Sequence, residues 1–362
     1  MNLLEEARIE INAVDAEMAK LFERRMRAAE KVAAYKKEMG LPILDPVREA
    51  KVIENGAALV EDETLRAYYV QFLRNNMAIS RAYQGRMLEG MKVAYSGTEG
   101  AFAHIATTKL FPDAAKVPFG NFEKAYRAVE NGECDVAVLP VENSSNGEVG
   151  QVTDLLFSGS LFVNGMIELA VSHDLLACPG ASMADIKTVI SHPQALGQCA
   201  DYIKKHGFET KEFANTALAA KWVAENKDPS IAAIASAEAA EIFGLSVLET
   251  NINQSRNNTT KFVVVSPVCH AHKNAEMGLH SILMFTVRNE AGALAKAVDV
   301  IGRYGFNMRT LRSRPMKELL WQYYFYMEAE GDISSEEGRQ MLRVLEMYCD
   351  RLKVLGTYVK GE

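Results

Sequence analysis

The sequence has no long apolar run, no close cysteine pair and no block of basic residues. No stretch approaches the ~18 apolar residues of a membrane-spanning helix, and the charges that begin at residue 5 exclude a signal-peptide core. We therefore expect no membrane partner. The five cysteines lie far apart, without a Cys-x-x-Cys pair, which favours a reducing cytoplasm over a disulfide framework. Since 47 acidic residues outnumber 40 basic ones, we also expect no nucleic-acid partner.

Signatures of cofactor and metal sites are missing as well. The chain has neither a Walker-type nor a Gly-x-Gly-x-x-Gly fingerprint. Its only close histidine pair, His270-Ala-His272, has no cysteine or carboxylate at ligand spacing, so we interpret it as part of a solvated linker. We predict no cofactor and no metal.

Three kinds of sequence pattern follow one another along the 362 residues, and this length suits two or three domains. Residues 3–88 have helical periodicity, and steps of three and four mark an apolar seam on a long first helix. The seam consists of Leu4, Ala7, Ile11, Val14, Met18, Leu21, Ala28, Val32 and Tyr35. Gly40 breaks this helix, Asp45 followed by a proline caps a second helix, and a third covers residues 64–88. A first helix ~50 Å long does not close a compact monomer core easily, so we expect a dimer that interlocks long helices.

Strands and helices alternate from residue 92 to residue 267, which predicts an α/β layer architecture. The expected strands are 92–95, 135–139, 187–190, 208–213, 231–235 and 260–266. The expected helices are 102–110, 121–131, 193–205, 215–225 and 236–243. Residues 267–278 lose apolar periodicity and read as a linker. The tail, 279–362, gives strand, helix, two strands, helix and strand, which is the order of ferredoxin-like domains.

Two cations share one face of the predicted first helix. Arg25 falls on the apolar seam, and Lys36 lies about 20° away around the helix. Arg8 points roughly 100° elsewhere, so another helix or another subunit would have to use it. Because buried cations need anions, they could pair internally, Arg25 with Glu49 for example, or hold the two carboxylates of a small dianion. The spacing favours neither reading.

Polar side chains gather where the predicted strands end. Four such clusters stand at residues 96–104, 142–146, 191–198 and 259–262. The first is a Gly-rich turn that suits either an anion or a plain tight turn. The second is either a turn capped by Asn143 or Ser144, or one wall of a binding site at the C-terminal end of a sheet. His192, beside a proline, suits a turn better than a catalytic base.

With these residues in place, the helical region resembles the all-helical chorismate mutase family, whose members are domain-swapped dimers. The positions that match the active-site pattern of that family are Arg8, Arg25, Lys36, Asp45, Arg48, Glu49, Ser80 and Gln84. The resemblance implies a Claisen rearrangement of chorismate to prephenate, driven by holding the substrate and stabilising developing charge. It implies that Arg8, Arg25 and Arg48 bind the carboxylates of the substrate, and that Arg8 does so in the active site of the partner subunit. Glu49 would accept a hydrogen bond from the ring hydroxyl, and Lys36 and Gln84 would donate hydrogen bonds to the ether oxygen.

The α/β region resembles prephenate dehydratases, whose domain has the two lobes of periplasmic binding proteins. Residues 140–147, 191–199 and 259–262 match the Pro-Ile-Glu-Asn-Ser, Ser-His-Pro-Gln and Thr-Arg-Phe motifs of that family. Lys261 replaces the arginine of the third motif, which keeps the charge but loses a bidentate grip. The resemblance implies that Thr260 is the main catalytic donor, assisted by Glu142 and Asn143; as a general acid, Glu142 would need a pKa raised by burial. The implied substrate-binding positions are Ser144, Ser191, Gln198, Lys261 and Phe262.

The tail resembles the ACT regulatory domain, which binds phenylalanine between subunits. Residues 292–295, Gly-Ala-Leu-Ala, stand for its Gly-Ala-Leu-Val motif, and residues 312–315, Arg-Ser-Arg-Pro, for its Glu-Ser-Arg-Pro motif. The implied phenylalanine-binding residues are Gly292, Ala293, Leu294 and Arg314. Arg312 replaces a carboxylate, which could alter the contact with the amino group of the effector.

We therefore expect a multidomain chain: an all-α chorismate mutase domain (1–90), an α/β two-lobed periplasmic-binding-protein-like dehydratase domain (91–268) and an α+β ferredoxin-like ACT domain (278–362). Its expected function is bifunctional, from chorismate through prephenate to phenylpyruvate in phenylalanine biosynthesis, with feedback by L-phenylalanine. A homodimer or homotetramer is expected. Two alternatives stay open, namely an inactive amino-acid-sensing regulator and a dehydratase that prefers arogenate.

Overall fold

The computed structural model describes residues 2–255, 257–270, 278–316 and 322–359. The chain divides into two compact units, residues 1–92 and residues 93–362. His272 and most of the predicted linker lie outside the described residues, so the interpretation of that histidine pair stays a prediction. In the described part of the chain, no helix is both long enough and apolar enough to cross a membrane.

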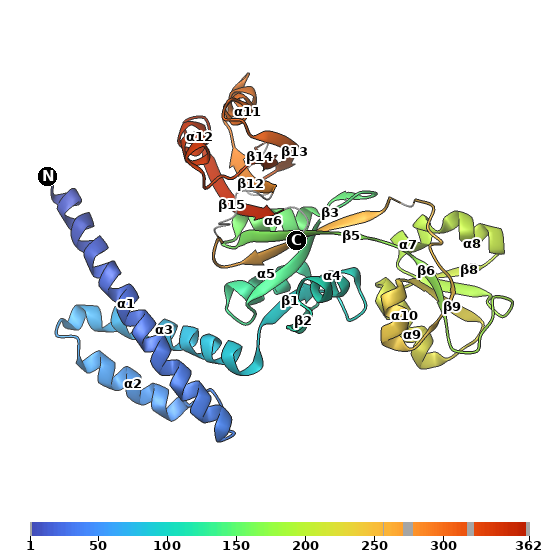
Figure 1. The fold of residues 1–362 in the computed structure, drawn as a ribbon, viewed down its shortest axis with the longest axis horizontal. Helices are drawn as coiled ribbons and strands as arrows, with labels where there is room; N and C mark the ends of the chain where they lie inside the picture. The colour runs from blue at the N-terminus through green and yellow to red at the C-terminus, as the bar shows by residue number, and fades with distance from the viewer. Residues whose placement is uncertain (1, 256, 271–277, 317–321, 360–362) are drawn as a thin grey trace. The chain divides into compact units, whose positions relative to one another are not determined.

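Three helices form the first unit: α1 (Leu3–Glu38), α2 (Pro46–Ala58) and α3 (Glu63–Glu89) (Figure 1). Their starts follow from the residue types. Asn2 and Glu5 form a reciprocal capping box on α1. Asp45 accepts from the N–H of Arg48 at the start of α2, where Pro46 is the first helical residue. The prediction of three helices, with Asp45 as the cap of the second, is confirmed.

The face of α1 that packs within this unit differs from the predicted apolar seam. Met26, Ala29 and Ala33 are the buried residues of α1, and Met77 is buried on α3. The large apolar residues of the seam are exposed in the single chain: Leu4, Ile11, Val14, Met18, Leu21, Val32 and Tyr35. Small side chains at positions 29 and 33 allow α3 to approach closely, while the seam itself is left uncovered by α2 and α3.

The first sheet of the second unit has the order β2-β1-β3-β11-β5, with β4 paired to β3. Its strands are β1 (Lys92–Ser96), β2 (Ala115–Phe119), β3 (Val136–Asn143), β4 (Gly147–Glu148), β5 (Phe162–Ala170) and β11 (Thr259–Ser266). Its helices are α4 (Phe102–Leu110), α5 (Phe122–Glu130) and α6 (Gly150–Ser158). Strands β1 and β3 are parallel, and β11 runs antiparallel between β3 and β5. This register places the ends of two predicted motifs, on β3 and β11, side by side.

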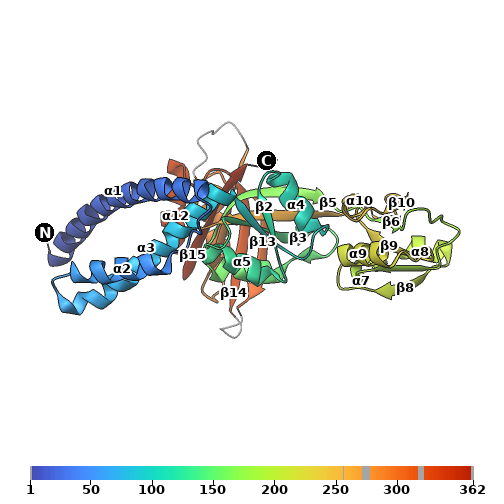
Figure 2. The ribbon, with the colours of Figure 1, turned by 90° about the horizontal axis from the view of Figure 1, so that it is seen from below.

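The second sheet has the order β10-β6-β9-β7-β8. Its strands are β6 (Asp174–Ala177), β7 (Thr188–Ser191), β8 (Glu209–Glu212), β9 (Ile231–Ala235) and β10 (Ser246–Glu249). Its helices are α7 (Pro193–Gln198), α8 (Ala200–His206), α9 (Thr216–Asn226) and α10 (Ala237–Phe243). The chain crosses between the sheets twice, after β5 and after β10, and the two sheets form separate lobes (Figures 1 and 2). The predicted two-lobed α/β architecture is confirmed.

Several elements of these lobes were not expected from the sequence: β2, β4, β5, β6, β10 and α6. Strand β2 carries Pro118, which has no N–H to donate to a sheet, and an edge strand tolerates it because one side of such a strand has no neighbouring strand. All four residues of β6 are buried, so this strand shows no alternation, and the glycines at the ends of α6, Gly150 and Gly159, are typical of turns. The single helix predicted over 193–205 is wrong, because the chain breaks at Cys199 into α7 and α8.

The C-terminal region folds as β12 (Leu279–Thr286), α11 (Ala293–Arg303), β13 (Asn307–Pro315), β14 (Tyr323–Glu330), α12 (Glu336–Glu346) and β15 (Arg351–Val359). Its sheet has the order β13-β14-β12-β15, so the predicted ferredoxin-like order is confirmed. Leu283 and Phe285 pack against its own helices, whereas Ile282 and Met284 belong to a core shared with the first lobe. Every residue of β12 is buried because both faces of the sheet are covered.

Candidate functional site

A pocket of about 310 Å³ in the helical unit gathers residues from all three helices. Seven of the eight residues predicted to bind chorismate line it: Arg25, Lys36, Asp45, Arg48, Glu49, Ser80 and Gln84. Arg8 does not. It is exposed on α1, about 26 Å along the helix axis from Arg25. The pocket of a single chain therefore lacks this cation.

Ion pairing in this pocket differs from the expected internal pair of Arg25 with Glu49. Glu49 forms an ion pair with Arg81 of α3, a residue outside the predicted set. Arg25 lies 3.5 Å from a backbone carbonyl of α3, and burial lowers the pKa of its guanidinium. Lys36 Nζ lies 2.5 Å from a carbonyl oxygen of the loop before α2. No carboxylate of the described residues forms an ion pair with Arg25 or Lys36, so both charges are available to an anionic ligand.

Gln84 presents an unused acceptor to the same pocket. Its Nε2 lies 3.2 Å from the carbonyl oxygen and 3.3 Å from the Oγ of Ser80, one turn earlier on α3. Its Oε1 is buried without a hydrogen-bond partner in the part of the chain that the structure describes. Because an unpaired buried acceptor is destabilising, a donor on a bound ligand would complement it.

A cleft of about 560 Å³ lies between the two lobes of the α/β region. Four helices direct their N-terminal ends to it, α4 and α5 from the first lobe and α7 and α9 from the second, through Phe102, Asn121, His192 and Thr216. Among the described residues that line the cleft there is no lysine or arginine. Helix N-termini carry unpaired N–H groups and partial positive charge, so they can receive carboxylates in place of cations. His192 caps α7 through Nδ1, which fits the predicted turn.

A directed hydrogen-bond network joins Asn143 and Thr260 in this cleft. Asn143 Oδ1 accepts from the backbone N–H groups of Ser145 and Asn146, each at 3.0 Å. Its Nδ2 is therefore the donor, to Asn258 Oδ1 at 2.8 Å and to Thr260 Oγ1 at 2.9 Å. Because the hydroxyl oxygen of Thr260 accepts this bond, its own hydrogen is left for a ligand.

Glu142 and Lys261 lie on the opposite face of the same two strands. Side chains alternate along a strand, so the neighbours of Asn143 and Thr260 face the C-terminal sheet. Glu142 forms an ion pair with Arg312 there and lies 3.5 Å from Lys261 Nζ. Burial alone would raise the pKa of Glu142, but the two cations bring it below its ordinary value. Neither residue lines the cleft. The lowered pKa of Glu142 corrects the expectation of a raised general acid, whereas substrate binding by Lys261 stays a prediction.

Gln198 and Phe262 line the cleft as expected, whereas Ser144 and Ser191 do not. Ser191 is fully buried, and its Oγ donates to a carbonyl oxygen of β9 at 2.5 Å. Ser144 Oγ lies 2.7 Å from a carbonyl oxygen and 2.9 Å from an N–H of the segment that enters β11. The hydroxyls of these two serines hold the backbone around the cleft, and their binding of substrate stays a prediction.

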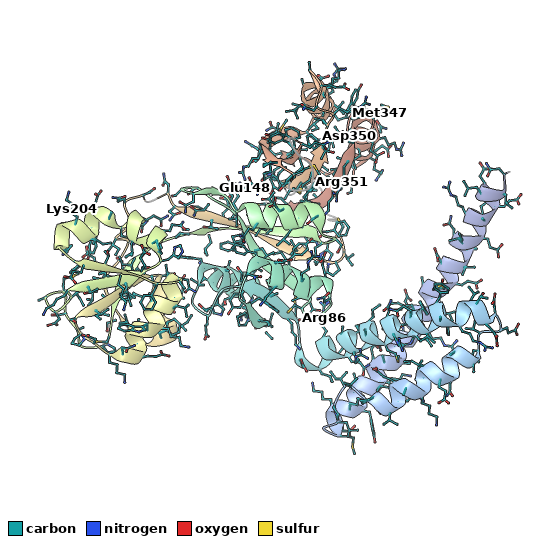
Figure 3. All side chains as sticks on the ribbon, turned by 180° about the vertical axis from the view of Figure 1, so that it is seen from behind. Arg86, Glu148, Lys204, Met347, Asp350 and Arg351 are labelled. Carbon is teal, nitrogen blue, oxygen red and sulfur yellow. The ribbon has the colours of Figure 1, made fainter. Side chains whose placement is uncertain are left out.

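The four residues predicted to bind phenylalanine do not come together in one chain. Gly292, with φ of +80°, caps α11, and positions 293 and 294 form its first turn, on the helix side of the C-terminal sheet. Arg314 instead extends from β13 to α6, where its Nε and Nη2 donate to the two oxygens of Asp154 at 3.1 and 3.2 Å. Glu148 and Arg351, labelled in Figure 3, also lie at this contact, since they bind Arg314 and the Phe157 carbonyl respectively. In the single chain Arg314 thus makes a contact between regions, and its binding of phenylalanine stays a prediction.

Asn258 and His173 are among the cleft-lining residues that lie outside the predicted set. Asn258 directly precedes the Thr-Thr-Lys-Phe motif, so an amide beside a predicted catalytic strand was an available signal. His173 lies between β5 and β6. Since neither flanking strand was predicted, nothing in the sequence marked this histidine as a strand-end residue.

Comparison with known proteins gives both regions a family. The chorismate mutase type II family matches residues 7–85, and the prephenate dehydratase family matches residues 93–269. The chain is 30% identical to the bifunctional chorismate mutase/prephenate dehydratase of Enterobacter agglomerans, over 97% of this chain and 94% of that protein. It is 34% identical to arogenate dehydratase/prephenate dehydratase 2, chloroplastic, of Arabidopsis thaliana, over 74% of this chain and 72% of that protein.

Two solved structures are similar in fold to the second unit. The prephenate dehydratase of Arthrobacter aurescens in complex with L-Phe has a TM-score of 0.68 and 26% identity, covering 75% of this chain and 90% of that one. GqqA, described as a novel type of quorum quenching acylase, has the same TM-score and 31% identity, covering 74% and 97%.

The helical pocket and the cleft thus define a fusion of a mutase with a dehydratase, an enzyme of phenylalanine biosynthesis. The chain belongs to the family of bifunctional chorismate mutase/prephenate dehydratases. It rearranges chorismate to prephenate and converts prephenate to phenylpyruvate.

Proposed function

We propose that the helical pocket holds chorismate through Arg25, Lys36 and Arg48 of one subunit and Arg8 of its partner. The observation that carries this is the pair of cations, Arg25 and Lys36, which contact backbone carbonyls and form no ion pair with a carboxylate among the described residues. Chorismate is a dianion, and its rearrangement needs no proton transfer. Fixing the reactive chair and stabilising charge on the ether oxygen is therefore enough for catalysis. Glu49, held by Arg81, accepts from the ring hydroxyl.

In the cleft, we propose that Thr260 donates to the departing ring hydroxyl of prephenate. The bond to the ring carboxylate breaks and its electron pair aromatises the ring, so carbon dioxide leaves. The C–O bond breaks with its electrons on oxygen, and the departing hydroxide takes a proton through the Thr260 hydroxyl, which solvent reprotonates, to become water. The bond from Asn143 to Thr260 Oγ1 supports this role, since it directs the threonine hydrogen away from Asn143. Helix N-termini receive the side-chain carboxylate, with Gln198 and Phe262 beside it.

We propose three domains, 1–90, 91–268 and 278–362, of which the last is an ACT domain that mediates feedback by L-phenylalanine. Its ferredoxin-like order supports this, as does the L-Phe named for the Arthrobacter aurescens dehydratase. The exposed seam of α1 supports assembly as a homodimer, or as a homotetramer built from such dimers. Five free cysteines fit a cytoplasmic location.

The test is to incubate the purified protein with chorismate alone and to follow chorismate, prephenate and phenylpyruvate with and without phenylalanine. Phenylpyruvate that is suppressed by phenylalanine is the expected result. Prephenate that accumulates without phenylpyruvate would refute the proposed cleft chemistry. Absence of any turnover would favour the alternative of an inactive amino-acid-sensing regulator.

A second candidate is a preference for arogenate, favoured by the 34% identity to the plant arogenate dehydratase/prephenate dehydratase. The ratio of kcat/KM for the two substrates decides between them. A ratio above one for prephenate is expected.

A further inference from the structure

His173 lies at the hinge between the two lobes of the dehydratase region, on the segment that joins β5 to β6. The residue is only 2% exposed, and it lines the cleft. Its ring meets Phe102 edge to face, with centroids 5.8 Å apart. Its Nε2 lies 2.8 Å from Gln198 Oε1, at the end of α7 in the second lobe. The imidazole therefore connects the hinge to a residue that lines the substrate cleft.

Backbone donors set the direction of the hydrogen bonds that lead to this histidine. Two backbone N–H groups can only donate to Asn143 Oδ1, so its Nδ2 donates to Asn258 Oδ1. Asn258 Nδ2 is then also a donor, and it donates to Gln198 Oε1 at 3.1 Å. Since Gln198 Oε1 is an acceptor, the hydrogen in its contact with His173 belongs to Nε2. The network thus assigns the tautomer of His173.

The same network leaves one donor unused at its end. Gln198 Nε2 and His173 Nδ1 are both buried without a hydrogen-bond partner among the described residues. With its carbonyl oxygen held by two donors, the Gln198 amide has a fixed plane, and its NH₂ group is free for a substrate oxygen. Without His173, only the bond from Asn258 would hold that oxygen. The terminal torsion of a glutamine is broad, so the amide would then sample other orientations.

We infer that His173 is a positioning residue of the dehydratase, which fixes the Gln198 amide so that its NH₂ group donates to an oxygen of the bound substrate. This inference rests on the proposed chemistry of the cleft. Burial lowers the pKa of His173, which keeps the ring neutral at neutral pH and leaves its single hydrogen on Nε2. His173 acts through Gln198 and does not touch the reacting atoms.

The first test is a double-mutant cycle on the full chain, with prephenate supplied directly. His173→Phe keeps the ring volume and the contact with Phe102, His173→Gln keeps a donor near Nε2, and Gln198→Met removes the amide. We expect His173→Phe to lower kcat at least ~tenfold with KM changed less than ~threefold, because a misplaced donor costs mainly transition-state stabilisation. His173→Gln should recover kcat to within ~threefold of wild type. The mutase activity of each preparation and the thermal unfolding of each chain serve as controls.

The coupling between the two residues decides the outcome. In the Gln198→Met background, His173→Phe should lower kcat less than ~twofold further, because the group it positions is already absent. Losses that multiply in the double variant would overturn the inference, and so would wild-type kcat in His173→Phe.

A second measurement needs neither turnover nor a folded His173→Phe variant. The tautomer of His173 can be determined by ¹⁵N NMR on histidine-labelled wild-type protein, with His173→Gln used to assign the signal. A neutral ring with hydrogen on Nε2 is expected. Hydrogen on Nδ1 would overturn the inference whatever the activity of the cleft, so this result is separable from a failure of the proposed dehydratase chemistry.

Discussion

Thr259 and Thr260 are identical neighbours on β11 that face opposite sides of the sheet. Thr260 lines the cleft and accepts from Asn143, whereas Thr259 does not line it. We predict that Thr260→Val lowers dehydratase kcat about 100-fold or more, because it removes the donor to the leaving hydroxyl while keeping the branched shape. Phenylpyruvate formation from prephenate measures this effect.

Thr259→Val is the matched control for that prediction and should stay within about threefold of wild type, since it makes the same chemical change outside the cleft. Mutase activity should be unchanged in both variants. Equal losses at the two positions would show that the strand, and not the hydroxyl of Thr260, is what matters.

Lys353 is a half-buried cation whose pKa gives a pH dependence of stability. Burial lowers its pKa to about 8, with a smaller contribution from Arg351. In the unfolded chain the lysine titrates near its ordinary value of 10.5, so between these two values the unfolded state binds more protons and stability rises with pH. We predict that the melting temperature of wild type, relative to Lys353→Met, increases between pH 7.5 and about 10. A difference that falls over this range would contradict the lowered pKa.

At the scale of elements, α6 is held along its length by the C-terminal region. The Arg314 guanidinium packs so closely on Gly150 that a Cβ there would lie 2.1 Å from it. Tyr324 stacks on Phe157 with ring centroids 4.3 Å apart, and Lys353 donates to the carbonyl oxygen of Gly159 at 2.5 Å. Residues 149 and 151, at the start of this helix, line the cleft. Helix α6 is therefore an element through which the C-terminal region can act on the cleft.

This arrangement predicts that Arg314→Gln separates effector binding from inhibition. Loss of the bidentate contact with Asp154 should weaken inhibition by phenylalanine about tenfold while leaving phenylalanine affinity within about threefold. Calorimetry measures the affinity, and dehydratase assays measure the inhibition. Arg309→Gln, on the same strand but exposed and paired with Glu330, is the control and should change neither. Lost phenylalanine binding in Arg314→Gln would instead make Arg314 an effector ligand.

For the whole molecule, the distance between Arg8 and its own pocket predicts mutase sites shared between subunits. Arg8→Gln and Lys36→Met should each abolish most mutase activity. Mixing and reassociating the two variants should restore about a quarter of wild-type activity, because half of the dimers are then mixed and each has one intact site of two. Chorismate consumption measures the recovery, and dehydratase activity is the control in every mixture. Absence of recovery in verified mixed dimers would place Arg8 in its own subunit's site.

The sequence by itself determined the order of the three regions and identified many of the residues that line the two pockets. Periodicity fixed the helical region, the α/β alternation and the ferredoxin-like tail, because local spacing reports which residues share a face. Motif residues such as Asn143 and Gln198 were identified by type. Elements such as β6 and α6 escaped, since all four residues of β6 are buried and show no alternation, and the glycines at the two ends of α6 are typical of turns.

Only the tertiary structure decided which way the site residues face. Glu142 and Asn143 are adjacent, yet one pairs with Arg312 and the other directs Thr260. Strand alternation guarantees that they diverge but not which one meets the cleft, because that depends on what covers each face. Tertiary packing also brings Arg314 to Asp154, 160 positions away in the chain, and His173 to Gln198, 25 positions away. Such contacts exist only once the lobes and the C-terminal sheet have packed together.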